Sequence, residues 1–172
     1  MKDTIMPKTK WYSPNLVAEL DQEEEVSFTD GEGILDATSN IISTLPVRGT
    51  STSTRGLITR ESNSLLFSNF NLPSINNITG IEVEVHVTRL ARIQDKQIQL
   101  YFNKPVGKNL ANLDAADITV YGSSQEKWGL QFSNIDFTSN NFGVIVDFQP
   151  HTQYPSSNQI YLRWVKLLVQ YE

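Results

Sequence analysis

A strict alternation of apolar and polar residues near the middle of the chain constrains its fold more than any other feature. Four β-branched residues alternate with four polar ones: Ile81, Val83, Val85 and Val87 with Glu82, Glu84, His86 and Thr88. Successive side chains of a strand point to opposite faces of a sheet, so this segment predicts a strand with one buried and one solvated face. The same period of two recurs in residues 98–102, 142–148 and 160–171.

Shorter candidate strands cover residues 56–59, 65–70 and 118–121, and Gly-, Pro-, Asn- and Ser-rich turns separate the runs. Convincing helical periodicity is scarce, and residues 109–116 offer one helical turn starting at an asparagine cap. Many short strands joined by turns are typical of sandwiches and barrels. The predicted fold class is all-β, an antiparallel β-sandwich that is jelly-roll-like and carries an irregular N-terminal arm.

The last alternating run changes parity within itself. Ile160, Leu162 and Trp164 share one parity, whereas Leu167, Val169 and Tyr171 share the other. One extra residue in a strand produces such a change, so we expect a β-bulge near Val165–Lys166. This reading places Trp164 in the inward phase and Tyr161 out of phase.

The chain has two regions that differ in their sequence pattern, which predicts two structural parts. Residues 1–55 are irregular and contain an acidic cluster at Asp21 and residues 23–25, whereas residues 56–172 hold the alternating runs. We interpret residues 1–55 as an arm that docks on a partner, and residues 56–172 as a sandwich that folds without it. Trp11, Tyr12 and Pro14 are the candidate partner-docking residues, because an aromatic anchor on an arm fits a partner's pocket.

Composition argues against several classes of function. The net charge of −5 and the scattered Lys and Arg residues do not form the basic patch of a nucleic-acid-binding domain. The chain has no cysteine, which excludes disulfides and thiolate ligands. No apolar run is long enough for a membrane-spanning helix, and the N-terminus has no secretory signal pattern, so we expect synthesis in the cytoplasm without membrane association.

Residues able to perform chemistry are few and dispersed. The two histidines, His86 and His151, have no metal-ligand spacing, and no phosphate-binding or nucleophile motif is present. The acidic cluster does not match a calcium-binding loop. A glycoside hydrolase needs a pair of carboxylates, and the candidates for it are Asp114, Asp117, Asp136 and Asp147. We expect these to be turn or strand-end residues, and therefore predict no enzyme, no cofactor and no metal.

Aromatic residues leave a second function class open. A carbohydrate-binding sandwich stacks sugars on exposed rings, for which the candidates are Trp11, Tyr12, Trp128, Tyr154, Tyr161 and Trp164. The alternative is that these rings pack in the core or at an interface. Exposed, coplanar rings at Trp128, Tyr154 and Tyr161 would favour the carbohydrate-binding module, and buried rings would exclude it.

An ordered set of short motifs runs through most of the chain. The motifs are Trp11 to Pro14, Ile78-Thr79-Gly80-Ile81 with its following strand, Tyr121-Gly122-Ser123-Ser124, Trp128-Gly129-Leu130, Ile135-Asp136, Asn141-Phe142-Gly143-Val144 and the closing Gln170-Tyr171. This series resembles a group of β-rich structural proteins encoded by tailed bacteriophages and prophages. The front third of the chain departs from that pattern in its acidic cluster and its Ser/Thr stretch.

The resemblance implies a non-enzymatic virion protein with a jelly-roll or sandwich module. We expect a capsid decoration or cement protein that binds neighbouring subunits, with a tail or head–tail connector component as the alternative. Its partners would be major capsid or tail proteins, and it would form a homo-oligomer. The motif residues read as folding positions: Gly129 lets the backbone pass under the Trp128 indole, Gly143 marks a bend or bulge, and Gly80 allows a kink or close approach.

Overall fold

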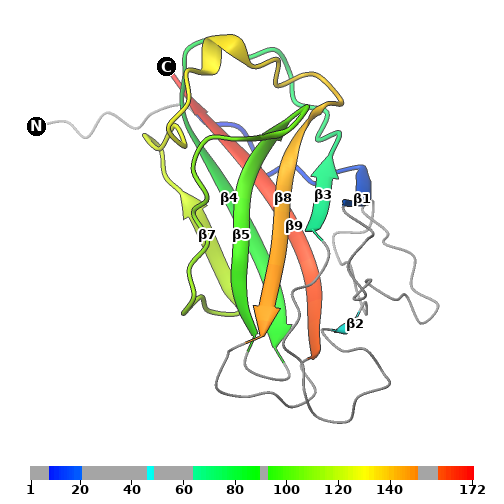
Figure 1. Ribbon diagram of the computed structural model, residues 1–172. Helices are drawn as coiled ribbons and strands as arrows, with labels where there is room; N and C mark the ends of the chain where they lie inside the picture. Colours follow the sequence, from blue (N-terminus) through cyan, green and yellow to red (C-terminus); the bar gives the residue numbers. More distant parts are fainter. Residues whose placement is uncertain (1–7, 21–45, 49–63, 90–92, 151–158) are drawn as a thin grey trace, which may run out of the picture.

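The computed structural model describes residues 8–20, 46–48, 64–89, 93–150 and 159–172. Nine strands and one short 3-10 helix form this part of the chain (Figure 1). They are β1 (Leu16–Leu20), β2 (Pro46–Arg48), β3 (Ser64–Ser68), β4 (Ile78–Arg89), β5 (Ile93–Phe102), β6 (Pro105–Val106), β7 (Ile118–Gly122), η1 (Phe132–Asn134), β8 (Phe142–Pro150) and β9 (Gln159–Tyr171). The candidate strand at residues 56–59 lies outside the described residues.

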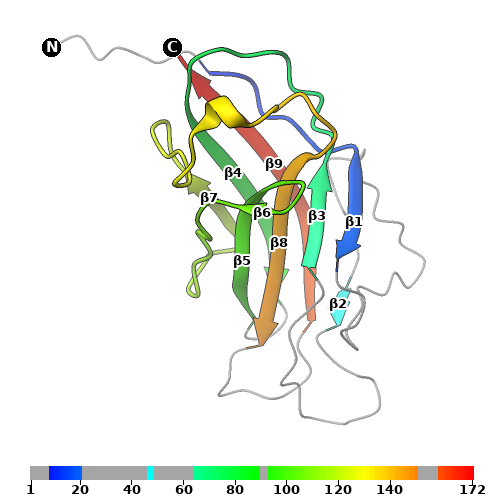
Figure 2. The ribbon, with the colours of Figure 1, turned by 45° about the horizontal axis from the view of Figure 1, so that its top comes forward.

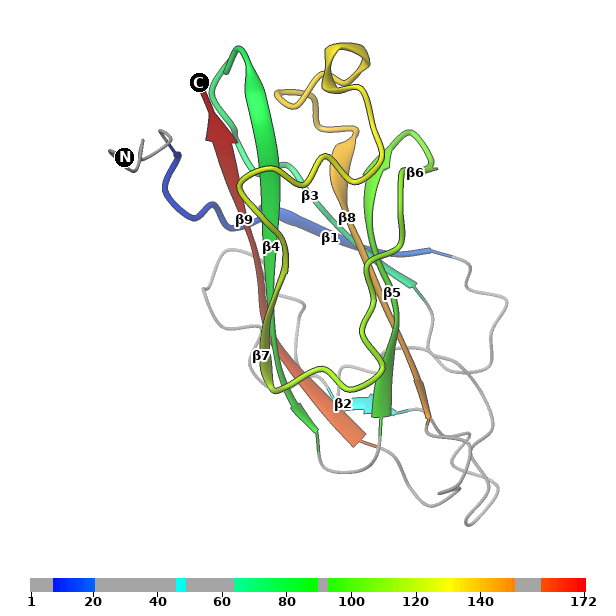
Figure 3. The same cartoon turned by 90° about the vertical axis from the view of Figure 1, so that its left-hand side faces the viewer.

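Two antiparallel sheets face each other, as the edge-on view in Figure 3 shows. One sheet has the strand order β1-β3-β8-β5-β6, and the other has the order β2-β9-β4-β7. The strands from β2 to β9 pair in a nested way, the first with the last and so on inward. The pairs are β2 with β9, β3 with β8, β4 with β7, and β5 with β6. This nested pairing is that of one long hairpin rolled into two sheets, which defines the jelly roll. The predicted fold class, an all-β antiparallel sandwich that is jelly-roll-like, is confirmed.

The inward faces of the long strands supply the core. Alternate residues of β4, Ile81 to Val87, are at most 2% exposed, as the period of two predicts. They meet the inward residues of the other strands, which are Leu65, Phe67, Ile98, Leu100, Phe142, Val144, Val146, Phe148, Leu162, Val165, Leu167 and Val169. The β-branched and aromatic residues of the sequence runs therefore build one core between the sheets.

The bulge in β9 exists, but two residues before its expected position. His86 of β4 pairs with Trp164, and the next residue, Val87, pairs with Leu162. Arg163 is thus the extra residue, and the strand changes parity there. Because Val165 is already inward, Trp164 lies on the outer face. The expectation that Trp164 faces the core is wrong.

Within residues 109–116 a single hydrogen-bonded turn forms at Asn112–Ala115 rather than a helix, and Asn109 has another role than its cap. Its side-chain oxygen accepts hydrogen bonds from the backbone N–H groups of Ile98 and Ala111, both at 3.0 Å. Its side-chain nitrogen donates to the carbonyl of Lys96 at 2.8 Å. The asparagine therefore satisfies the backbone of β5 beside the two-residue strand β6, in place of a strand partner.

The described residues of the N-terminal segment pair with the chain's own sheets. β1 extends the first sheet next to β3, and β2 pairs with the beginning of β9. Toward the end of β9, the segment before β1 adds two isolated bridges, Lys8 with Gln170 and Tyr12 with Leu167. The segment thus completes both sheets of its own sandwich, and whether the boundary at residue 55 separates an independent arm stays a prediction.

Candidate functional site

Two loops and the end of β9 lie at one end of the sandwich, the upper end in Figure 2, and several residues of the motif series belong to them. We use "upper end" for the loops that join β3 to β4 and β7 to β8, together with the end of β9. Trp128, in the β7–β8 loop, is fully buried. Its indole Nε1 donates to the carbonyl of Ile81 at 3.0 Å, and its backbone N–H donates to Glu126 Oε1 at 2.6 Å. The indole therefore fixes this loop over the beginning of β4.

Two glycines make room for the loop on β4. Gly122 has a φ of +86°, and a Cβ there would collide with the carbonyl of Ile81 and lie 3.2 Å from Nε1 of Trp128. A Cβ on Gly80 would collide with the backbone of Ser123 and Ser124. Gly80 thus serves the expected close approach, and the register of β4 on β9 also shifts beside it. The glycine beside the indole is Gly122, not Gly129 as the sequence suggested.

Gly129 and Gly143 have other surroundings. Gly129 has a φ of +72° and lies against the side chain of Lys108. Gly143 pairs with Ser68 and Tyr101 without a register shift, so no bulge forms there. A Cβ on Gly143 would instead collide with the carbonyl of Phe67. Glycine at this position allows a close approach of neighbouring chain rather than a bulge.

Stacked aromatic rings follow Trp128 in the same loop. The ring centroids of Phe132 and Phe137 lie 5.3 Å apart, and those of Phe137 and Phe142 lie 4.8 Å apart, both pairs edge to face. Phe142 is 1% exposed and belongs to the core, so the half-buried rings of Phe132 and Phe137 extend the core toward the surface. Asn141, the motif residue before Phe142, is exposed and accepts a backbone hydrogen bond from Asn103.

A side-chain-capped turn holds Phe137 in place. Asp136 Oδ1 accepts hydrogen bonds from the Thr138 hydroxyl at 2.6 Å and from the Thr138 backbone N–H at 3.0 Å. These bonds favour the ionised carboxylate and lower the pKa of Asp136 below its ordinary value of 3.8. Asp136 is therefore a turn residue, as the sequence analysis expected.

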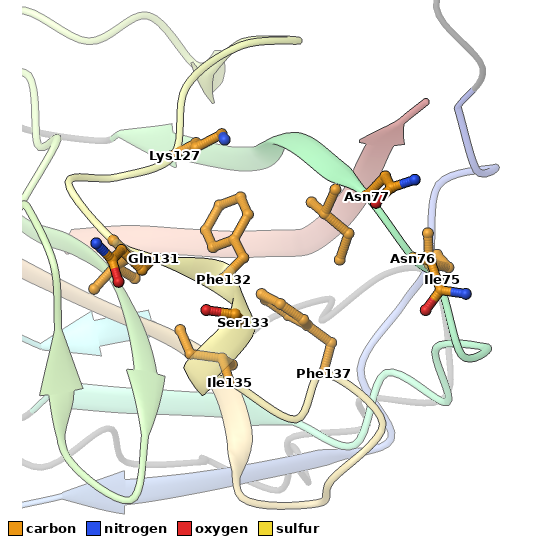
Figure 4. Close-up of a pocket in the computed structure, with 11 residues that line it drawn as sticks. Ile75, Asn76, Asn77, Lys127, Gln131, Phe132, Ser133, Ile135 and Phe137 are labelled. Carbon is orange, nitrogen blue, oxygen red and sulfur yellow. The ribbon is translucent and has the colours of Figure 1, made fainter.

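A pocket of about 620 Å³ opens between the β3–β4 loop and the β7–β8 loop (Figure 4). The rings of Phe132 and Phe137 lie at its centre, with Gln131 on one side and Asn77 on the opposite side. Its lining consists of Ile75, Asn76, Asn77, Ile78, Lys127, Leu130, Gln131, Phe132, Ser133, Ile135 and Phe137. Ile78, Leu130 and Ile135 belong to the motif series, but no sequence pattern predicted the pocket. The sequence features that could have indicated a pocket are weak: they are the turn residues 71–77 and the polar residues around the Trp128 motif.

The three candidate docking residues lie along β9 and β3. Tyr12 is half-buried, and its backbone exchanges hydrogen bonds with Leu167 at 2.7 and 2.9 Å. Pro14 is buried, whereas Trp11 is 37% exposed. Tyr12 and Tyr171 also line a second hollow of about 480 Å³ beside the β3–β4 loop. Of the three, Trp11 has the exposed ring that a partner could contact.

The outer face of the β2-β9-β4-β7 sheet carries a polar aromatic cluster. Trp164 Nε1 donates to Glu84 Oε1 at 2.7 Å, and the rings of Trp164 and His86 lie 4.1 Å apart. Lys166 Nζ lies 4.7 Å from the centroid of the indole. The Trp164 ring is thus held between a histidine and a lysine on the sheet surface.

Within the described part of the chain, β7 is an outermost strand of this sheet, which we call its free edge. It pairs with β4 on one side and stands last in the strand order. Two of its apolar side chains, Ile118 and Val120, are 52% and 45% exposed. An edge strand with apolar side chains offers unpaired backbone groups to another chain.

The four carboxylates considered for catalysis make contacts within the fold, and Asp147 lies in the interior of β8 rather than in a turn or at a strand end, as was expected. Asp147 is 2% exposed, pairs with Lys96 at 3.3 Å, and accepts hydrogen bonds from Ser64 and from the Phe148 N–H. Asp114 and Asp117 are exposed in the segment before β7, and the carbonyl of Asp117 accepts from Val87. Among the described residues, no three His, Asp or Glu side chains gather as metal ligands would.

A buried acid–phenol contact joins the two sheets. The motif residue Tyr121 is 4% exposed, and its hydroxyl donates a hydrogen bond to Asp95, which is 1% exposed. Asp95 precedes a bulge in β5, where Lys96 is the extra residue opposite Phe148 and Asp147. The motif tyrosine therefore satisfies a buried carboxylate and links β7 to β5 across the core.

Other residues that the sequence analysis named fall outside the described residues. They are the acidic cluster at residues 21–25, His151 and Tyr154, and nothing is described of the side chain of Tyr161. The part of the chain in view contains no helix long and apolar enough to cross a membrane. No protein-family model, no curated protein and no solved structure matches the chain.

Proposed function

We propose that this chain is a non-enzymatic structural protein of a tailed-bacteriophage virion, in which it decorates the capsid. The motif series in the sequence is the origin of this proposal. The structural settings of the motif residues are compatible with it, because Gly80, Gly122 and Trp128 fix a loop on β4, and Tyr121 joins the sheets. A module that binds a capsid needs a rigid shape, and these residues shape the fold instead of converging on a substrate.

The free edge at β7 is the observation that carries the assembly role. Its outward side chains Ile118 and Val120 are exposed apolar residues on a strand that has a partner on one side only among the described strands. A neighbouring subunit that adds a strand there would satisfy the backbone and cover the apolar side chains. The neighbour is a major capsid protein or a second copy of this chain, and many such contacts on one particle give high avidity.

Two other assignments are weaker. A tail or head–tail connector role uses the same edge and differs in the number and position of copies. A carbohydrate platform that includes Trp128 is excluded, because that ring is fully buried and its Nε1 is bonded to the chain itself.

Rebinding to particles tests the proposal. Purified chain is mixed with phage particles from the strain that encodes it, stripped of this protein, and bound copies per particle are counted after sedimentation. We expect saturation at a fixed copy number. The double variant Ile118→Lys with Val120→Lys should weaken binding at least about tenfold, because two charges would be buried at the contact.

A matched control separates the strand edge from exposed apolar surface in general. Leu113 is 54% exposed but lies in a turn before β7, and Leu113→Lys should bind as the wild type does. The absence of the protein from purified particles, together with a failure to rebind, would overturn the proposal. A copy number of six or twelve would move it to the tail or connector.

A further inference from the structure

We propose that the upper-end pocket binds a saccharide, a unit of one or two sugar rings that carries a carboxylate. The pocket is separate from the β7 edge, since its lining comes from residues 75–78 and 127–137 and not from Ile118 or Val120. The inference therefore goes beyond the proposed virion role and stands or falls separately from it.

The size and floor of the pocket suit a sugar ring. Its volume of about 620 Å³ falls within the range of about 300–1,000 Å³ for small-molecule sites. The floor is apolar and half-buried, and consists of Ile75, Ile78, Leu130, Phe132, Ile135 and Phe137. A pyranose has an apolar C–H face, which packs on aromatic and aliphatic side chains of this kind.

The rim is made of uncharged hydrogen-bonding groups. Asn76, Asn77, Gln131 and Ser133 line the pocket and are exposed, and no hydrogen bond of their side chains is found within the described part of the chain. Each amide offers both a donor and an acceptor, and the serine hydroxyl offers both as well. Neighbouring hydroxyl groups of a sugar can bond to such paired donors and acceptors. An apolar peptide side chain in the pocket would leave these rim groups without a partner.

The charge of the lining selects among saccharides. Lys127 is the one charged residue among the eleven that line the pocket, and no carboxylate is present there. A cationic ligand is therefore disfavoured, and a single carboxylate is favoured by one ammonium group. A phosphate cluster would need more than one cation.

The walls are held in place before any ligand arrives. Trp128 fixes the start of the loop through Ile81, and the Asp136–Thr138 turn holds Phe137 against Phe142. On the other side, Asn77 adopts a φ of 54°, and its carbonyl accepts from the N–H of Glu172 at 3.0 Å. A pre-formed site loses little conformational entropy on binding.

NMR titration of the full-length, ¹⁵N-labelled chain tests the proposal. The probes are methyl glycosides of glucose, galactose and N-acetylglucosamine, and the acidic sugars glucuronic acid and N-acetylneuraminic acid. We expect saturable shifts of the side-chain amides of Asn76 and Gln131 with at least one acidic sugar, at a Kd in the range of about 0.1–10 mM. Shifts that map elsewhere, or no shifts with any probe, overturn the proposal.

Two variants and two controls complete the test. Gln131→Ala should weaken binding about tenfold, and Lys127→Ala should remove the preference for acidic over neutral sugars. Gln125→Ala and Lys104→Ala change exposed residues outside the pocket and should leave binding unchanged. Unchanged binding in Gln131→Ala, or equal losses in the control variants, would contradict the assignment. Failure here leaves particle rebinding intact, and failure of rebinding leaves sugar binding intact.

Discussion

The three tryptophans of the chain lie in three different settings, which their local sequence only partly indicates. Trp128 is fully buried, Trp11 is 37% exposed, and Trp164 lies on the outer face of a sheet. The burial of Trp128 depends on glycines at positions 80 and 122, which come from other elements. The position of Trp164 depends on one extra residue, Arg163, in β9. Sequence parity alone could not distinguish these settings, because a bulge moves every later side chain to the other face.

Trp128→Phe should destabilise the fold by about 2–3 kcal/mol, because it leaves a cavity and removes the hydrogen bond to the Ile81 carbonyl. Urea unfolding followed by circular dichroism measures the change. Trp11→Phe is the control and should change the free energy of unfolding by less than about 0.5 kcal/mol. Equal effects of the two substitutions would show that the Trp128 indole does not lock the loop.

Among the elements, the long strands could be predicted and the short ones could not. β4, β5, β8 and β9 carry apolar residues at alternate positions, because each turns one face toward the core, and β8 is buried on its other face as well. β1, β2 and β6 were missed. β2 and β6 are three and two residues long and contain proline, and β1 reads Leu-Val-Ala-Glu-Leu without alternation. These strands exist because neighbouring strands offer them an edge to pair with, which is a tertiary cause that local sequence does not record.

Deletion of residues 1–15 tests the role of the segment before β1. The deletion removes the backbone hydrogen bonds of Thr9 and Tyr12 to β9 and the buried Pro14. We expect the free energy of unfolding to fall by about 2–4 kcal/mol, with the sandwich still folded. Deletion of residues 1–7 is the control and leaves those bonds in place. Unchanged stability after the larger deletion would support the original view of a separable arm.

At the scale of the whole molecule, the alternating sequence pattern predicts the sandwich, whereas the pocket arises from the jelly-roll pairing of the strands. The nested pairing of β2 with β9, β3 with β8 and β4 with β7 brings the loop at residues 75–77 beside residues 127–137. These segments lie some fifty residues apart in the sequence, and neither has a pattern that indicates contact with the other. The same roll places β7 at a sheet edge with Ile118 and Val120 exposed. Both candidate surfaces thus follow from topology rather than from local motifs.

Cryo-electron microscopy of purified particles from the encoding strain tests the virion role most directly. We predict one sandwich-shaped density at each of many equivalent capsid positions, with the β7 edge against a neighbouring subunit and the upper end facing solvent. Particles without this density, in a preparation where mass spectrometry does not detect the chain, would contradict the virion role. Density with β7 exposed to solvent would contradict the edge contact on which the assembly role rests.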